Sequence, residues 1–244
     1  MKKNFFKTMS LSLLFGSMCV GFVACSSDDD DENSGGEGKS PAQAIDLGLP
    51  SGTLWASCNV GATKPEEYGD YFAWGEVIGY KGGKTEFSWD NYKWANTLWT
   101  GQTINITLTK YSFHGYFGAI DGKKELDLED DAAYVNWGIN WRMPSREQIK
   151  ELIDYCNWEW ITLKGVKGMK ATGPNGKSIF LPAAGERNGT LFKYVNDDGN
   201  YWSCSLGGDD WAHDLYIDWR EGIGANSGSR DRQMGQSVRP VRIK

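Results

Sequence analysis

Residues 144–158 read PSREQIKELIDYCNW, and this stretch is the strongest structural signal in the chain. Ser145 and Gln148, three residues later, have the spacing of a capping box, and Pro144 fixes the backbone just before it. Apolar residues then recur at helical spacing, which is typical of an amphipathic helix with one buried face. The expected buried stripe is Ile149, Leu152, Ile153 and Cys156.

A second helical segment precedes the first, at residues 126–138 with the sequence LDLEDDAAYVNWG. Asp127 is the expected N-cap, the acids at 129–131 favour the positive end of the helix dipole, and Gly138 is a suitable stop. The same acids could be read as a calcium site, since hard cations prefer clustered oxygens. They lack the glycine turn and the spaced ligands of an EF-hand loop, so we expect helix capping and no metal.

Short strands are indicated on both sides of the helices. In TLWASCNV (53–60), Leu54 and Ala56 alternate with Trp55 and Ser57, which is a strand pattern. Residues 75–125 are rich in glycine and aromatic residues with weak periodicity, and we expect mainly loops there. Further strand candidates are KSIFLPAAG (177–185), NYWSCSL (200–206), HDLYIDW (213–219) and QSVRPVRIK (236–244).

The pattern of helices followed by several strands predicts an α+β domain, with two helices packed on short antiparallel sheets joined by long loops. Trp141 is the expected buried anchor before the second helix. Pro240 within a strand implies an edge or a bulge. Arg239 beside it is expected to pair with an acid of the fold rather than with a ligand.

The N-terminal residues indicate export. Residues 1–24 carry three lysines, no acid and a short apolar run, which is typical of a signal peptide; a membrane-spanning helix would need about 20 apolar residues. FVAC resembles a bacterial lipobox, which implies lipidation of Cys25. Residues 25–44 then form an expected hydrated acidic tether, and residues 45–244 one domain.

Charge and cysteine content limit the partners. Three of the 26 basic residues and none of the 32 acidic residues lie in 1–24, so the remainder has a net charge of about −9. Such a chain is not suited to bind nucleic acid or anionic lipid. Cys58, Cys156 and Cys204 remain beyond the tether, and either one disulfide or three free thiols would be compatible with the sequence.

Six sequence blocks of the chain resemble known family motifs, and they occur in the same order as in that family. They are similar to the successive signatures of the Fibrobacter succinogenes major paralogous domain. This resemblance implies a C-type-lectin-like fold, related to formylglycine-generating enzymes and lectin-like adhesins, on an outer-membrane, surface-exposed lipoprotein. The blocks are IDLGLPSGTLWASCNVGA (45–62), GDYFAWGE (69–76), DDAAYVNWGINWRMPSREQIKELI (130–153), GPNGKSIFLPAAGERNG (173–189), YWSCSL (201–206) and GQSVRPVR (235–242).

The residues favour binding over catalysis. His114 and His213 are far apart in sequence and lie in no recognisable catalytic motif, and Cys204 has no neighbouring cysteine of the kind the related enzymes use. We therefore expect no enzyme activity and no cofactor. The C-terminal segment mixes aromatic, acidic and basic residues among glycines, which suits a glycan or a protein surface. The candidate ligand-binding residues are Asp209, Asp210, Trp211, His213, Arg220, Asn226, Arg230 and Arg232.

Two further interpretations remain open at this point. Residues 207–236 have the place and composition of a segment varied by a diversity-generating retroelement. The protein could instead be an accessory or structural subunit of a cell-envelope assembly. Within the segment, Trp211 is expected to point outward, and Trp219 inward, on the side of Leu215 and Ile217.

Overall fold

The structure is a computed structural model that describes residues 40–220 and 224–242, without the side chains of 224–226. The expected signal segment, Cys25 and most of the expected tether lie outside these residues. None of the helices in the described part is long and apolar enough to span a membrane.

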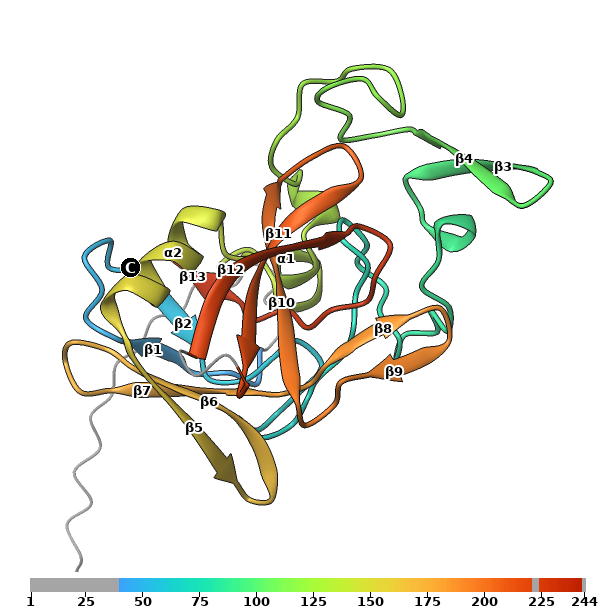
Figure 1. The fold of residues 1–244 in the computed structure, drawn as a ribbon. Helices are drawn as coiled ribbons and strands as arrows, with labels where there is room; N and C mark the ends of the chain where they lie inside the picture. The colour runs from blue at the N-terminus through green and yellow to red at the C-terminus, as the bar shows by residue number, and fades with distance from the viewer. Residues whose placement is uncertain (1–39, 221–223, 243–244) are drawn as a thin grey trace, which may run out of the picture. The chain divides into compact units, whose positions relative to one another are not determined.

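The described residues form mainly small antiparallel sheets (Figure 1). The sheet orders are β1-β2-β13, β10-β11-β12, β5-β6-β7, β3-β4 and β8-β9. The strands are β1 (Ala44–Asp46), β2 (Leu54–Ala56), β3 (Ala95–Thr100), β4 (Thr103–Leu108), β5 (Asn157–Leu163), β6 (Val166–Thr172), β7 (Ser178–Pro182), β8 (Glu186–Asn188), β9 (Leu191–Lys193), β10 (Asp198–Leu206), β11 (Trp211–Asp218), β12 (Gly224–Asp231) and β13 (Val241–Arg242).

Helical structure is limited to short segments. The described α-helices are α1 (Ala132–Trp137) and α2 (Arg146–Tyr155), with single 3-10 turns at η1 (Trp89–Asn91) and η2 (Leu128–Asp130). The predicted fold class, an α+β C-type-lectin-like domain, is therefore wrong, because the described chain is a β-rich fold. The helical periodicity at 126–155 is real, but it supports helices of only 6 and 10 residues.

The capping box of α2 is confirmed. The Ser145 hydroxyl accepts from the Gln148 amide, and the Gln148 side chain accepts from the Ser145 amide. The N-cap of the first helix was predicted wrongly. Asp131 caps α1 by accepting from the amides of residues 133 and 134, while Asp127 makes no capping bond because its carboxylate is paired with lysines. Gly138 ends α1 at a φ of 93°, as expected.

Residues 75–125 contain one regular element that was not predicted. Strands β3 and β4 pair over their whole length as a hairpin, which stands clear of the other sheets (Figure 1). Leu98 and Trp99 on β3 are 66% and 54% exposed, respectively. The Trp99 indole donates to the Asp90 carboxylate, which ties the hairpin to the turn at η1. β4, with the sequence TINITL, alternates polar and apolar residues, so this segment carried a strand signal that the sequence reading missed.

The core joins α2 to the C-terminal strands. Ile149 and Leu152 are fully buried and belong to one cluster with Tyr201, Leu215 and Ile217. This apolar contact holds α2 beside the sheet β10-β11-β12 (Figure 1). Trp141 is buried beside α1, as predicted, at 5% exposure.

The end of the chain closes the first sheet. β13 is the edge strand of the sheet β1-β2-β13 and has one further bridge, from Val241 to Arg142, so Pro240 lies just before an edge strand, in agreement with the prediction. Arg239 does not pair with an acid as expected. Its buried guanidinium donates to Asn59 Oδ1 (2.8 Å) and to the carbonyls of Ala56 and Phe180, because that site holds backbone acceptors and no carboxylate.

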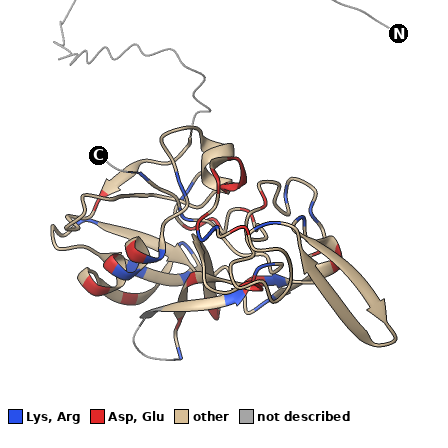
Figure 2. Cartoon of the chain, turned by 90° about the horizontal axis from the view of Figure 1, so that it is seen from above, with Lys and Arg blue, Asp and Glu red and all other residues tan. Residues whose placement is uncertain are grey.

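Charged residues of both signs are spread over the described elements rather than gathered by sign (Figure 2). Local pairing therefore decides the electrostatics of each site. The three described cysteines, Cys58, Cys156 and Cys204, are free thiols, the first two buried and the last half-buried.

Candidate functional site

The alternation of side chains along β11 sets up the site. Trp211, His213, Leu215 and Ile217 share one face of the strand, and Asp214 and Asp218 lie on the other. Leu215 and Ile217 lie in the core against α2, whereas His213 lies beyond the core at the beginning of the strand. At this end the chain forms a pocket.

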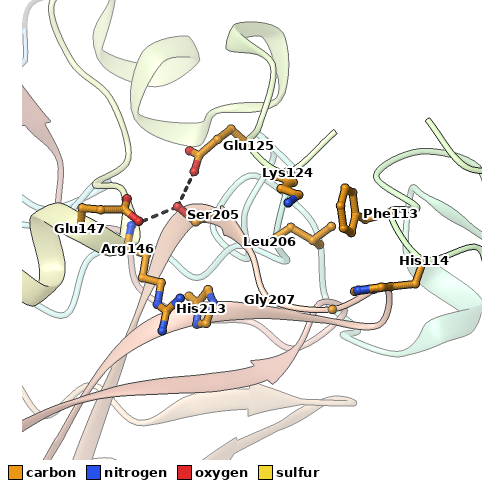
Figure 3. A pocket seen from close by; sticks show the side chains of 11 residues that line it. Phe113, His114, Lys124, Glu125, Arg146, Glu147, Ser205, Leu206, Gly207 and His213 are labelled. Atoms are coloured by element: carbon orange, nitrogen blue, oxygen red, sulfur yellow. Dashed lines mark hydrogen bonds between the residues drawn. The ribbon is translucent and has the colours of Figure 1, made fainter. Parts of the chain in front are cut away.

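The pocket has a volume of about 320 Å³ and is built from segments that are distant in sequence (Figure 3). The first turn of α2, the end of β10, the start of β11 and two loops meet there. Figure 3 shows the Arg146 side chain beside His213, with His114 approaching from the opposite side. The lining residues are Phe113, His114, Lys124, Glu125, Arg146, Glu147, Ser205, Leu206, Gly207, Gly208 and His213.

Hydrogen bonds occupy the carboxylates of the pocket. Glu125 accepts from the Cys204 thiol and from the Ser205 hydroxyl, each at 2.7 Å. Glu147 accepts from the Ser145 hydroxyl at 3.0 Å. Burial, together with the charge of Glu125, raises the pKa of Cys204 well above its ordinary value. The Cys204 thiol is therefore neutral and a weak nucleophile.

The two imidazoles of the pocket have different surroundings. Burial, followed by the nearby charge of Arg146, lowers the pKa of His213, so this ring is neutral at pH 7. The ring also bonds to the backbone of Gly228, and the edge of Trp211 packs on it at 5.3 Å between centroids. His114 is exposed and lies with Nδ1 3.6 Å from Asp209 Oδ1.

The two cations of the pocket, unlike its carboxylates, have no hydrogen-bonded side-chain partner of opposite charge or polarity among the described residues. Among residues 40–220 and 224–242, no carboxylate pairs with the side chain of Arg146 or of Lys124. The Lys124 ammonium lies over the Phe113 ring, 3.9 Å from its centroid. Cation–π contact of this kind leaves the charge accessible to an anion.

Two of the predicted ligand-binding residues are structural supports. Asp209 is buried and accepts from the amides of Phe113 (2.7 Å), His114 (2.8 Å) and Tyr116 (2.9 Å). Burial opposes ionisation of Asp209, but these three bonds outweigh it and lower the pKa. Asp209 therefore fixes the loop that brings His114 to the pocket.

Arg232 is also fully buried, and it contacts three aromatic rings rather than solvent. Its guanidinium donates to the hydroxyl of Tyr92 and to the carbonyls of Tyr111 and Asp209, the last at 2.6 Å. Because Arg232 is buried, its guanidinium is not accessible to a ligand.

Asp210 and Trp211 lie near the pocket and are half-buried. The carbonyl of Asp210 accepts from the Arg232 amide. Trp211 covers Gly207 and Gly208, where an added Cβ would lie 1.8 Å and 2.3 Å from its ring. The pocket wall therefore needs glycine at both positions.

Trp219 was expected inward, and that prediction is wrong. β11 ends at Asp218, so the alternation stops one residue before Trp219, which is 52% exposed in the turn that follows.

Two of the remaining candidates, Arg220 and Arg230, contact acids of the opposite face of the sheet. Arg220 is exposed and donates to Asp218, with Nη2 2.9 Å from Oδ2. Arg230 is half-buried, 3.5 Å from Glu186, and lies over the Tyr216 ring. Asn226 belongs to β12, and its side chain lies outside the described residues. The structure thus divides the predicted set between buried supports, the pocket and this second face.

The second face carries buried acids that the sequence reading missed. Burial, then repulsion from Glu186 and Asp218, raises the pKa of Asp198 to about 7. Burial likewise raises the pKa of Asp214 to about 7. In the sequence, Asp214 and Asp218 occupy positions that alternate with Leu215 and Ile217. This alternation could have predicted an acidic face on the strand.

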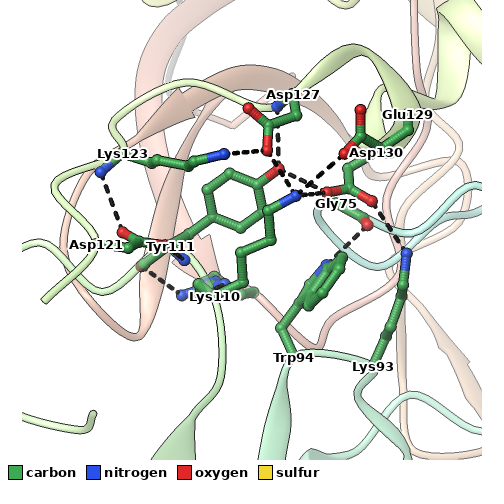
Figure 4. Close-up of polar contacts among 11 residues, drawn as sticks. Gly75, Lys93, Trp94, Lys110, Tyr111, Asp121, Lys123, Asp127, Glu129 and Asp130 are labelled. Atoms are coloured by element: carbon green, nitrogen blue, oxygen red, sulfur yellow. Dashed lines mark hydrogen bonds and ion pairs between the residues drawn. The ribbon is translucent and has the colours of Figure 1, made fainter. Parts of the chain in front are cut away.

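The acids of residues 127–130 form a separate cluster (Figure 4). Carboxylate oxygens of Asp127, Glu129 and Asp130 lie within 4.8 Å of one another, which is close enough to hold a cation. The Lys110 ammonium already lies among them, 2.6 Å from both Asp127 and Asp130. Burial alone would lower the pKa of Lys110, but these hydrogen bonds outweigh it and raise the pKa.

Comparison of the chain with family models, with curated proteins and with solved structures finds no match. Functional inference therefore depends on the geometry of the sites.

Proposed function

We propose that the protein is a recognition module that binds a glycan in the pocket between α2 and the beginning of β11. We further propose that lipidated Cys25 and the acidic tether display it at the outer surface of the outer membrane. The observation that supports binding is the convergence of hydrogen-bonding groups, including Arg146 and His213, on a pocket whose walls are held by a helix and a sheet.

The chemistry of the pocket favours holding a ligand over transforming it. The Ser205 hydroxyl of the pocket and the neighbouring Cys204 thiol both donate to Glu125, and the raised pKa of Cys204 keeps that thiol neutral. Arg146, Lys124 and the imidazoles offer donors, and the carboxylates offer acceptors, which suits the mixed hydroxyls of a sugar. Rigid walls also lower the entropic penalty of binding a small ligand.

The direct test is a glycan array with the purified domain, followed by calorimetric titration of the positive glycans. His213→Ala removes a wall of the pocket, and Trp211→Ala removes the ring that supports it, so both are expected to reduce binding at least tenfold. Arg220→Ala, on the opposite face, is the matched control and should leave binding unchanged. Circular dichroism melting of each variant separates loss of binding from loss of folding. Equal loss in all three variants, or no binding by the wild type, would refute the proposal.

A second candidate function is supported by the β3–β4 hairpin. Leu98 and Trp99 expose apolar surface on a two-stranded element, which is more typical of a contact with another protein than of a free surface. In that case the protein would be a subunit of a cell-envelope assembly. Cross-linking from Leu98→Cys in intact cells, compared with Lys150→Cys on α2, tests this alternative.

A further inference from the structure

We infer that the pocket selects a glycan carrying an acidic group, a carboxylate or a sulfate, which Arg146 and Lys124 bind together. This inference rests on the proposed function, and it names the class of ligand that the pocket would take.

The charge state of the pocket carries the inference. Its carboxylates accept hydrogen bonds from neighbouring side chains, at 2.7 Å for both bonds to Glu125 and 3.0 Å for the bond to Glu147. Its two cations have no carboxylate partner within the described ranges. Arg146 and Lys124 line the same pocket from segments distant in sequence, so an anion bound there has charged donors from both segments.

The position of Arg146 supports the same conclusion. It is the first residue of α2, where the positive end of the helix dipole disfavours a cation. Its amide donates to the Ser205 hydroxyl at 3.0 Å, so the backbone is fixed and the side chain is left to extend beside His213 (Figure 3). A bound anion would offset the unfavourable interaction between the Arg146 charge and the helix dipole, which explains a cation at this position.

His213 provides an independent readout of the anion. Burial and the Arg146 charge lower the pKa of His213, whereas the acids that face it, Glu147 and Glu125, raise the pKa. An anion bound to Arg146 would neutralise the charge that opposes protonation of the ring. The pKa of His213, followed by NMR, is therefore expected to rise when an acidic ligand binds and to stay unchanged with a neutral one.

The size of the pocket favours a sugar over a peptide. A volume of about 320 Å³ is at the lower end for small-ligand pockets and suits a single acidic sugar unit with its neighbour. Trp211 packs directly on Gly207 and Gly208, so this wall of the pocket is fixed by an aromatic ring. An extended acidic peptide would need a longer groove.

The test compares matched ligands by calorimetric titration of the wild-type domain. The ligands are a glucuronate-containing oligosaccharide, the same oligosaccharide with its carboxyl reduced to the alcohol, a sulfated neutral oligosaccharide and oligoglutamate. We expect the glucuronate or the sulfated ligand to bind at least about tenfold more tightly than the reduced one, since charge-assisted hydrogen bonds are the strong class. The preference should weaken as salt is added.

Arg146→Gln and Lys124→Gln keep a flexible polar side chain at each position and remove its charge. Each is expected to reduce affinity for the acidic ligand by a larger factor than affinity for the reduced ligand, so that most of the preference is lost. Lys150→Gln, on the exposed side of α2, is the matched control. All variants are first compared by thermal unfolding.

The outcomes separate the two proposals. Equal binding of acidic and reduced ligands by wild type, unaffected by Arg146→Gln, overturns this inference and leaves the proposed function standing. Failure of every oligosaccharide to bind overturns the proposed function itself. Binding of oligoglutamate alone overturns the glycan assignment and favours an acidic protein partner.

Discussion

Replacing Asp214 by Asn is expected to stabilise the protein at alkaline pH and to have little effect in acid. Asp214 is fully buried on β11 and has one long hydrogen bond, from Gln236 Nε2 at 3.3 Å. Its Oδ1 atom has no hydrogen-bond partner among the described residues. Burial therefore disfavours the charged carboxylate and raises the pKa to about 7.

The sign and the size of the effect follow from linkage. In the unfolded chain the carboxyl ionises near a pKa of about 3.9, whereas in the folded protein it ionises near about 7. Folding therefore loses stability as the pH rises between these values, because only the unfolded state is charged there. At about 1.4 kcal/mol for each pH unit, the Asp214 carboxylate lowers the free energy of unfolding by about 4 kcal/mol above pH 7. Asn has nearly the same shape and does not ionise.

Urea unfolding of wild type and Asp214→Asn should therefore be measured from about pH 4 to about pH 9. The difference in unfolding free energy between the two proteins is expected to grow by about 3 to 4 kcal/mol in favour of the variant over this range, with most of the change below pH 7. Asp154→Asn, on the exposed side of α2, is the control and should show no comparable growth. A difference that stays constant with pH would refute the assignment of a raised pKa to Asp214.

Four further predictions concern stability. Ser145→Ala removes the capping box of α2 and should lower the unfolding free energy by about 1 kcal/mol in urea. Asp209→Ala leaves three amides of the 113–116 loop without an acceptor; we expect a loss of about 2 kcal/mol or more and faster amide exchange in that loop. Arg239→Met leaves a buried amide oxygen and two carbonyls without their donor and should lower the unfolding free energy by about 3 kcal/mol, measured by thermal unfolding. Trp219→Ala should change it by less than about 1 kcal/mol, and a larger loss in urea would show that the ring is not exposed.

The sequence predicted structure where the signal is local. The capping box at Ser145, the stop at Gly138 and the strands around residues 178–182 and 198–218 all depend on residues that are close together in the chain. The prediction of the fold class was wrong because the fold class depends on how many short elements combine. The β3–β4 hairpin was missed although β4 alternates polar and apolar residues; only β3 departs from that pattern, with Leu98 and Trp99 adjacent and both exposed.

The candidate site could be predicted only in part, because its residues meet through the tertiary structure. His213 was identified from its polar, glycine-rich segment, and it does line the pocket. Arg146 was read only as part of a helix, since nothing near it in sequence shows that it lies beside β11. Asp209 and Arg232 are charged residue types that are usually found at the surface. They are buried here because amides, carbonyls and aromatic rings from residues 74–116 contact them.

One strand separates two electrostatic environments in this protein. The side chains of β11 alternate, so His213 faces the pocket with its unpaired cations while Asp214 faces the buried acids of the opposite side. The sheet that separates the pocket from the buried acids screens their charges less than water would. It nevertheless keeps the groups that line the pocket apart from the groups that set stability. Changes at Asp214 should therefore alter unfolding without altering ligand preference, and changes at Arg146 should do the reverse. Independence of this kind would let residues of the pocket be substituted without a penalty in folding.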